Sequence, residues 1–124
     1  MICAVALISL LAVQSAFAHA QLTMSTPENK ASLKESPAQV DLWFNELLDE
    51  GFNSVEVYPA TELNAKQHIN MVMNDPRVDE KSQNHIVARL KPLQPGDYIV
   101  DYRVLSRDGH TAPGRITFTI LATK

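Results

Sequence analysis

Alternation of apolar and polar residues in short runs restricts the fold of this sequence more than any other feature. In an extended chain every second side chain lies on the same face, so a period of two predicts a strand with one buried face. The longest series carries Tyr98, Val100, Tyr102 and Val104. Further runs alternate in the same way; they lie at residues 40–44, 54–58, 68–73, 85–90 and 115–120. The pattern predicts about six or seven strands.

Helical periodicity is almost absent from the same part of the sequence. Residues 47–50 are compatible with a single helical turn, and no other segment after the first 18 residues repeats apolar residues at helical spacing over a sufficient length. Residues 74–84 are polar and charged, and we expect them to form a solvated loop.

A turn signal identifies the kind of β-fold. Pro95-Gly96 is followed by Tyr98 at the start of the longest predicted strand. This arrangement is typical of a tyrosine corner, in which the tyrosine hydroxyl returns to the backbone a few residues upstream. The sequence therefore predicts an all-β fold, an immunoglobulin-like Greek-key β-sandwich of about seven strands.

The first 18 residues contain no Asp, Glu, Lys or Arg. Their apolar run, residues 2–13, is shorter than the roughly 20 residues of a transmembrane helix, and Ala16 and Ala18 form the Ala-x-Ala pattern of a signal-peptide cleavage site. The basic residues that normally open a signal peptide are missing. We expect residues 1–18 to be a cleaved signal peptide and residues 19–124 to be one periplasmic domain. An uncleaved anchor or a buried N-terminal helix is the alternative.

Size, charge and cysteine content limit the classes to which this chain can belong. The 124 residues are enough for one hydrophobic core and too few for two large domains. The 11 Lys and Arg residues are outnumbered by 14 Asp and Glu, and no basic run occurs, so we expect no nucleic-acid interface. Cys3 lies in the segment expected to be removed, so the mature domain has to be held together without a disulfide.

A mature chain that begins at His19 offers two nitrogen ligands from one residue, the α-amino group and the imidazole. This chelate suits Cu(II), which prefers tetragonal sets of nitrogen and oxygen ligands. Asp108 and His110 follow the longest predicted strand with only Gly109 between them, and residues two apart in an extended segment point to the same side. Asp-x-His alone is more typical of an ordinary surface turn than of a metal site, but its coincidence with His19 favours a copper site.

Taken together, the motifs of this sequence resemble the CopC family of periplasmic copper-resistance proteins. The resemblance covers essentially all of residues 19–124. It rests on the Ala-x-Ala site before His19-Ala20-Gln21-Leu22, and on Ser25-Thr26-Pro27, Leu42-Trp43-Phe44-Asn45-Glu46, the turn at residues 93–98, the strand at residues 100–106 and Asp108-Gly109-His110.

The resemblance implies a sandwich that binds Cu(II) through His19, Asp108 and His110. In family members the acid of the Phe-x-Glu segment lies beside this site, which adds Glu46 as a candidate; otherwise Glu46 is an ordinary solvent-facing residue. The resemblance also implies a monomeric copper-binding protein, not an enzyme, that sequesters copper in the periplasm or delivers it to an integral membrane copper-transport protein.

Some CopC proteins also hold Cu(I) in a methionine-rich loop, because thioethers suit the softer ion. This sequence departs from that pattern: between residues 62 and 84 its only methionines are Met71 and Met73, with His68 three residues before Met71. A Cu(I) site at His68, Met71 and Met73 would be short of ligands. We expect instead that the two methionines pack in the core.

Two other functions compete with copper carriage. Oxidative polysaccharide monooxygenases also hold copper through an N-terminal histidine on a sandwich core, but they are larger and present a flat substrate surface with exposed aromatic residues. This chain has a single Trp, Trp43, and it lies within a strand pattern. Four protein ligands would also leave no position open for oxygen chemistry. The second alternative is a structural sandwich that binds no metal.

Overall fold

The computed structural model of the protein describes residues 20–122. Eight strands and one short 3-10 helix follow one another along this part of the chain. In chain order they are β1 (Leu22–Thr26), β2 (Ala31–Leu33), β3 (Gln39–Phe44), β4 (Ser54–Pro59), η1 (Ala60–Glu62), β5 (Val72–Val78), β6 (His85–Leu90), β7 (Gly96–Leu105) and β8 (Thr111–Ile120). Among these residues no helix is long and apolar enough to cross a membrane.

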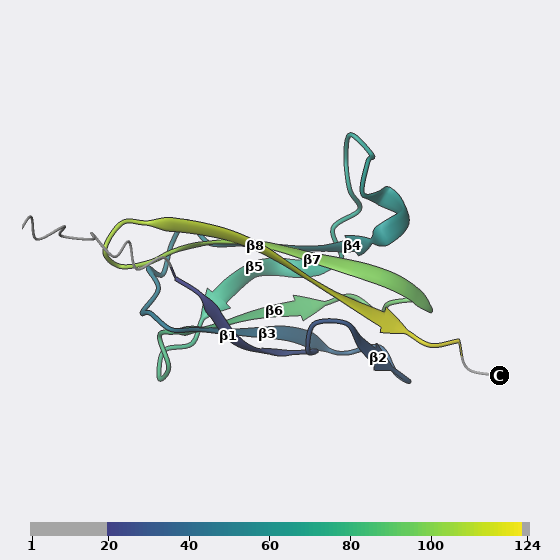
Figure 1. Ribbon diagram of the computed structural model, residues 1–124, viewed down its shortest axis with the longest axis horizontal. Helices are drawn as coiled ribbons and strands as arrows, with labels where there is room; N and C mark the ends of the chain where they lie inside the picture. Colours follow the sequence, from purple (N-terminus) through teal and green to yellow (C-terminus); the bar gives the residue numbers. More distant parts are fainter. Residues whose placement is uncertain (1–19, 123–124) are drawn as a thin grey trace, which may run out of the picture.

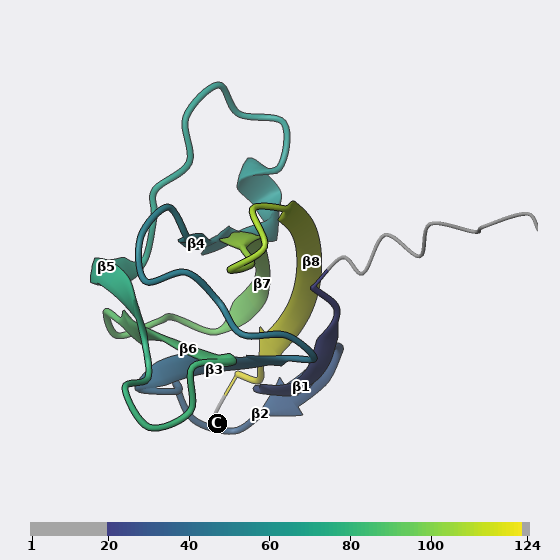
Figure 2. The same ribbon diagram turned by 90° about the vertical axis from the view of Figure 1, so that its left-hand side faces the viewer.

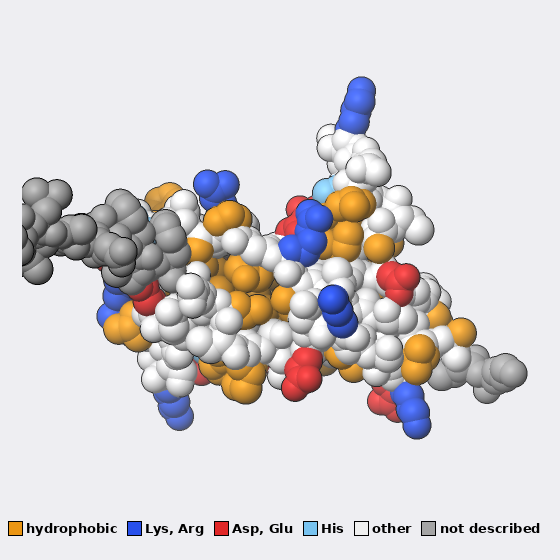
Figure 3. Space-filling view, viewed as in Figure 1, with side chains coloured by type: hydrophobic (Ala, Val, Ile, Leu, Met, Phe, Trp, Pro, Cys, Tyr) orange, Lys and Arg blue, Asp and Glu red, His pale blue; other side chains and the backbone are white. Residues whose placement is uncertain are grey.

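The strands form two four-stranded sheets that pack face to face (Figures 1 and 2). One sheet has the order β1-β3-β6-β5 and the other the order β2-β8-β7-β4. All pairs are antiparallel except β2 and β8, which run parallel. The predicted all-β, immunoglobulin-like sandwich is confirmed, with the three-residue β2 as an addition to the expected strands. On the face seen in Figure 3, apolar side chains are visible between the two sheets, and charged side chains of both signs are scattered singly around them.

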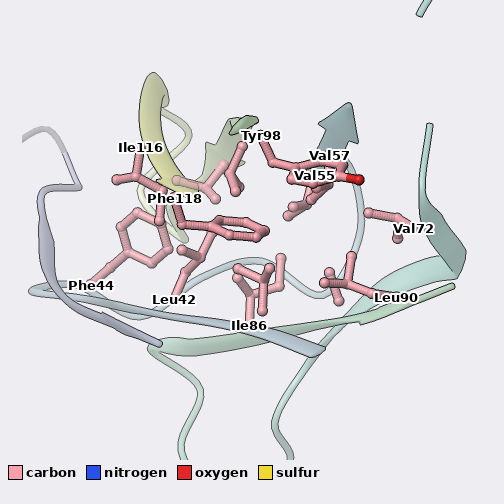
Figure 4. Packing of buried hydrophobic residues seen from close by; sticks show 14 of the residues in the cluster. Leu42, Phe44, Val55, Val57, Val72, Ile86, Leu90, Tyr98, Ile116 and Phe118 are labelled. Carbon is pink, nitrogen blue, oxygen red and sulfur yellow. The ribbon is translucent and has the colours of Figure 1, made fainter. Parts of the chain in front are cut away.

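Alternate residues of the strands fill the space between the sheets (Figure 4). In β3 the inward side chains are Val40, Leu42 and Phe44, all at most 1% exposed, as the alternation predicts. Inward positions of the other predicted runs are buried as well, namely Val55, Val57, Ile86, Ala88, Leu90, Tyr98, Val100, Val104, Ile116, Phe118 and Ile120, whereas Tyr102 is only partly buried. Burial of these apolar side chains is the main stabilising contribution in a domain that contains no disulfide among its described residues.

The predicted tyrosine corner is present at the start of β7. The Tyr98 hydroxyl donates a hydrogen bond of 2.7 Å to the carbonyl oxygen of Gln94, four residues upstream. This bond ties the turn before β7 to the strand itself and satisfies the hydroxyl of a ring that is otherwise buried.

Three local expectations are wrong. Residues 47–50 form no helical turn, because their backbone pairs with the end of β7; the helical turn lies at Ala60–Glu62. The other two are the strand expected at residues 68–73 and the loop expected at residues 74–84, and both predictions fail for the same reason. β5 runs from Val72 to Val78, with an irregular register between Met73 and Arg77. A bulge of this kind breaks the period of two that the sequence pattern relies on.

Candidate metal centre

The beginning of the described chain lies against the connection that follows β3. Asn45 and Gln21 exchange two hydrogen bonds: the Gln21 N–H donates to Asn45 Oδ1 at 2.7 Å, and the Asn45 N–H donates to the Gln21 carbonyl oxygen at 3.0 Å. Ala20 is 6% exposed and belongs to the hydrophobic core. The chain therefore enters the sandwich at a fixed point, beside residues 45–53.

The same connection pairs with the end of β7. The Asp49 N–H donates to the Leu105 carbonyl oxygen at 2.8 Å, and the Arg107 N–H donates to the Leu47 carbonyl oxygen at 3.1 Å. Between these bonds Leu48 forms a β-bridge with Ser106, and its side chain is completely buried. Three segments that are distant in the sequence are thus held together at one end of the sandwich.

The turn between β7 and β8 is organised by Ser106, a polar residue only 1% exposed. Its N–H donates to the His110 carbonyl oxygen at 2.9 Å, and its own carbonyl oxygen accepts from the Gly109 N–H at 3.0 Å. The Ser106 hydroxyl lies within hydrogen-bonding distance of Asp108 Oδ1 and, at 3.1 Å, of the His110 carbonyl oxygen. Gly109 has φ of 91°, which favours glycine at this position.

This turn brings Asp108 and His110 together. His110 Nδ1 lies 3.3 Å from Asp108 Oδ1, and the two side chains are 45% and 50% exposed. Nitrogen and oxygen ligands bind first-row divalent ions at about 2 Å, so two neighbouring ligand atoms in a square arrangement are about 3 Å apart. The pair therefore fits two adjacent positions around one ion.

The charge of Asp108 also suits a cation. The hydrogen bond from the Ser106 hydroxyl, followed by the bonds from the backbone and ring of His110, lowers the pKa of the Asp108 carboxyl below its usual value. The Asp108 carboxyl is therefore ionised at neutral pH, as an oxygen ligand of a cation has to be.

The other candidate residues are Glu46 and His19. Glu46 is half-buried on the connection beside the turn. Within residues 20–122 no group of three or more His, Cys, Asp or Glu side chains is arranged to hold a metal ion, so Glu46 does not complete such a group with Asp108 and His110. His19 lies outside the described residues, as does the signal-peptide cleavage site.

Comparison with known proteins identifies the family of this chain. The family model described as the CopC domain matches residues 22–121, which is most of the chain. The chain belongs to the CopC family. CopC proteins are copper-binding proteins and not enzymes, so the expected absence of enzymatic activity is supported by family membership.

Curated relatives carry copper-related names. The chain is 35% identical over 109 residues to copper transport protein CutJ of Bacillus subtilis (strain 168), a match that covers 86% of this chain and 19% of CutJ. It is 34% identical over 114 residues to copper resistance protein C of Xanthomonas campestris pv. juglandis, covering 89% of this chain and 86% of the relative. The chain thus spans about a fifth of CutJ and most of the resistance protein.

Solved CopC structures share the fold. A crystal structure of PcoC, a methionine-rich copper resistance protein from Escherichia coli, superposes with a TM-score of 0.68 at 27% identity, covering 83% of this chain and 99% of PcoC. CopC from Methylosinus trichosporium OB3b superposes with a TM-score of 0.74 at 24% identity, covering 86% and 97% of the two chains.

Ser106 is the functional residue that the sequence analysis of this CopC domain did not single out. In the sequence it is only the last polar residue before the turn. The available signal was its position two residues before Asp108, since serine hydroxyls often bond to groups two residues away in turns.

The residues considered for Cu(I) have different surroundings. His68 places Nδ1 2.9 Å from Glu56 Oε1 and stacks its ring on Tyr58, with 3.7 Å between the ring centroids. Met71 packs against the core, as expected, whereas Met73 is 38% exposed, so the expectation that both methionines are core residues is wrong for Met73.

The stacked Tyr58 belongs to a polar cluster on the outer face of β4, β7 and β8. Its hydroxyl donates to Asp101 Oδ2 at 2.7 Å, and Arg115 Nε donates to Asp101 Oδ1 at 2.6 Å. Burial, and then the hydrogen bond to the charged Asp101, raise the pKa of Tyr58 to about 12. Burial alone would raise the pKa of Asp101, but the bonds from Arg115 and Tyr58 outweigh it and lower that pKa.

Proposed function

We propose that this CopC protein binds Cu(II) as cargo, through the α-amino group and imidazole of His19 together with Asp108 and His110. Glu46 lies beside this site as an additional acid. The proposal includes cleavage after Ala18, so that residues 19–124 are the mature domain and His19 supplies its free amine. The amine and imidazole nitrogens of His19, together with Asp108 and His110, make a set of four nitrogen and oxygen ligands of the type that Cu(II) prefers.

The observation that carries the proposal is the convergence of the chain start with the Asp108–His110 turn. Gln21 is bonded to Asn45, and the connection that begins at Asn45 is bonded to Leu105 and Arg107. His19 precedes Gln21 by two residues, within about 7 Å of extended chain. The distance of 3.3 Å between Asp108 and His110 suits adjacent ligands of one ion.

As a carrier, the protein would act in the periplasm as a monomer. It would sequester Cu(II) or deliver it to an integral membrane copper-transport protein. The copper-related names of the relatives and the exposed position of Asp108 and His110 support a site from which the ion can be passed on.

The experiment compares two forms of the mature domain that differ only by one pyroglutamate residue placed before His19, which removes the free amine from the terminus. Cu(II) affinity is measured by competition with a chelator of known affinity, and the first residue of each form is verified by intact mass. We expect the extended form to bind orders of magnitude more weakly, because no free amine remains to form a chelate with the imidazole of His19. Equal affinity of the two forms would refute the role of the terminus.

A His110→Ala variant of the native-start form separates the two halves of the site. We expect a large loss of affinity there as well, with an unchanged unfolding temperature, because the His110 side chain is exposed on a turn. Absence of Cu(II) binding by the unmodified domain would favour the structural sandwich without metal.

A further inference from the structure

Two features of Phe52 are unfavourable for the stability of the domain. Its side chain is 89% exposed, more than that of any other large apolar residue among those described. Its backbone has φ of 59°, in the left-handed region, which is uncommon for residues with a Cβ and is unfavourable for bulky ones. Gly51, which would adopt this conformation without cost, lies one position earlier. Departures from local preference on an ordered loop are typical of functional positions.

Hydrogen bonds hold the loop that presents Phe52. Asp49 Oδ1 accepts from the Gly51 N–H at 2.9 Å, and the Asp49 carbonyl oxygen accepts from Asn53 Nδ2 at 2.5 Å. Asn53 Oδ1 in turn accepts from the Leu105 N–H at 2.8 Å, which fixes the loop to the end of β7. The backbone on both sides of Phe52 is therefore held in place, and little backbone entropy remains to be lost when a partner covers the ring.

The loop lies at the end of the sandwich that carries the Asp108–His110 turn, because residues 47–49 pair with residues 105–107. Leu47, on the same connection, is 49% exposed. The connection at residues 45–53 contains three acids, Glu46, Asp49 and Glu50, and no Lys or Arg. An exposed aromatic residue on an acidic connection thus lies at the same end of the sandwich as the candidate copper ligands.

We propose that Phe52 and Leu47 form a docking surface for a copper transport protein, which receives them in an apolar pocket bordered by Lys or Arg. The inference rests on the proposed function, because the surface would place the copper-bearing turn against the partner. Buried aromatic anchors dominate protein interfaces, and complementary charges around them guide association.

CutJ supports this choice of partner. There the matching segment makes up 19% of one chain named a copper transport protein, so the rest of that chain is permanently next to the domain. On the present domain, Phe52 offers an anchor for such a neighbour at the end where copper would be passed on.

The test places the photo-crosslinking amino acid p-benzoyl-phenylalanine at position 52 of the full chain, in cells of the protein's own host, and identifies adducts by mass spectrometry. The control position is Ile69, an apolar residue that is 64% exposed and lies beyond the other end of β4. We expect roughly tenfold more adduct with a copper transport protein from position 52 than from position 69. An adduct with a second copy of this chain alone, equal adducts from both positions, or none from position 52 would overturn the proposal.

A Phe52→Asn variant distinguishes docking from metal binding. Asparagine tolerates the left-handed conformation, so the variant should fold with equal or higher stability. Its Cu(II) affinity should be unchanged, while its association with the crosslinked transport protein should weaken roughly tenfold or more. Unchanged association would refute the docking surface and leave the copper site intact, whereas failure of the unmodified domain to bind Cu(II) would refute the proposed function and not the crosslink.

Discussion

The ring of Tyr102 occupies the space that a side chain at position 114 would fill. Tyr102 and Gly114 are directly opposite in the β7–β8 pair, and a Cβ added at Gly114 would lie less than 3.0 Å from three atoms of the tyrosine side chain. Tyr102 also meets Phe44 edge-to-face, with 5.4 Å between ring centroids. Gly114 therefore allows an aromatic side chain of one strand to lie across its neighbour.

Gly114→Ala is expected to destabilise the domain by about 1–3 kcal/mol, because the added methyl group displaces a ring that is packed against Phe44. Denaturant unfolding measures this loss. Gly51→Ala is the control, since a Cβ there meets only Asp49 Oδ1 at an ordinary 3.6 Å. In a Tyr102→Ala background the same Gly114→Ala change should cost less. Equal costs in both backgrounds would show that the ring is not the obstacle.

Ser106→Ala is expected to weaken Cu(II) binding by roughly 10- to 100-fold, the usual effect of removing a residue that orients a metal ligand. The change also removes the main cause that lowers the pKa of Asp108, so that pKa should rise toward its usual value. Chelator competition and an NMR titration of the carboxyl measure the two effects. Ser25→Ala is the matched control, because Ser25 is also buried and its hydroxyl donates to the Pro27 carbonyl oxygen at 2.9 Å, away from the turn. Equal losses of affinity in the two variants would contradict a specific role for Ser106.

Cu(II) affinity is expected to fall by roughly a hundredfold or more between about pH 7.5 and pH 5. Amine and imidazole ligands must lose a proton before they bind, and in model compounds they do so near pH 8 and 6.5. The lowered pKa of Asp108 keeps this carboxylate charged throughout that range, so it does not contribute to the change. Competition titrations at the two pH values test this, and equal affinities would show that nitrogen ligands are not used.

Alkaline conditions should unfold the domain partly through Tyr58. Its pKa is about 12 in the folded protein and about 10 in an unfolded chain, so the neutral phenol is favoured by folding. The corresponding stability is fully present below pH 10 and is lost as the pH rises through the folded pKa. Denaturant unfolding between about pH 9 and pH 11.5 should show a steeper decline in the wild-type protein than in Tyr58→Phe. Parallel declines would mean that Tyr58 is not responsible.

Regular strands were predictable because their residues follow one rule. At Val40, Leu42 and Phe44 the alternation alone identifies the buried face. β5 breaks the rule, since Asn74 has φ of 60° and the pairing shifts between Met73 and Arg77. The fold of residues 47–49 depends on the Leu105 carbonyl oxygen and the Arg107 N–H, which lie more than fifty residues away in the sequence and leave no local pattern.

The candidate site was predictable to a similar degree. Asp108 and His110 share a short turn, so their proximity follows from spacing. The bond that fixes Asp108 comes from Ser106, whose burial depends on the packing of Leu48 from a remote segment. The left-handed backbone of Phe52 was equally hidden, because the adjacent Gly51 is the residue that a turn would be expected to use.

β8 runs from one end of the sandwich to the other. The strand leaves the Asp108–His110 turn at Thr111 and reaches the opposite end of the sandwich at Ile120, where the carboxyl-terminal residues emerge (Figure 1). Immobilising the domain on a sensor surface through a tag placed after this strand would leave the metal-bearing end facing solution. A tag at the amino terminus would instead block the very amine that the proposed chelate requires.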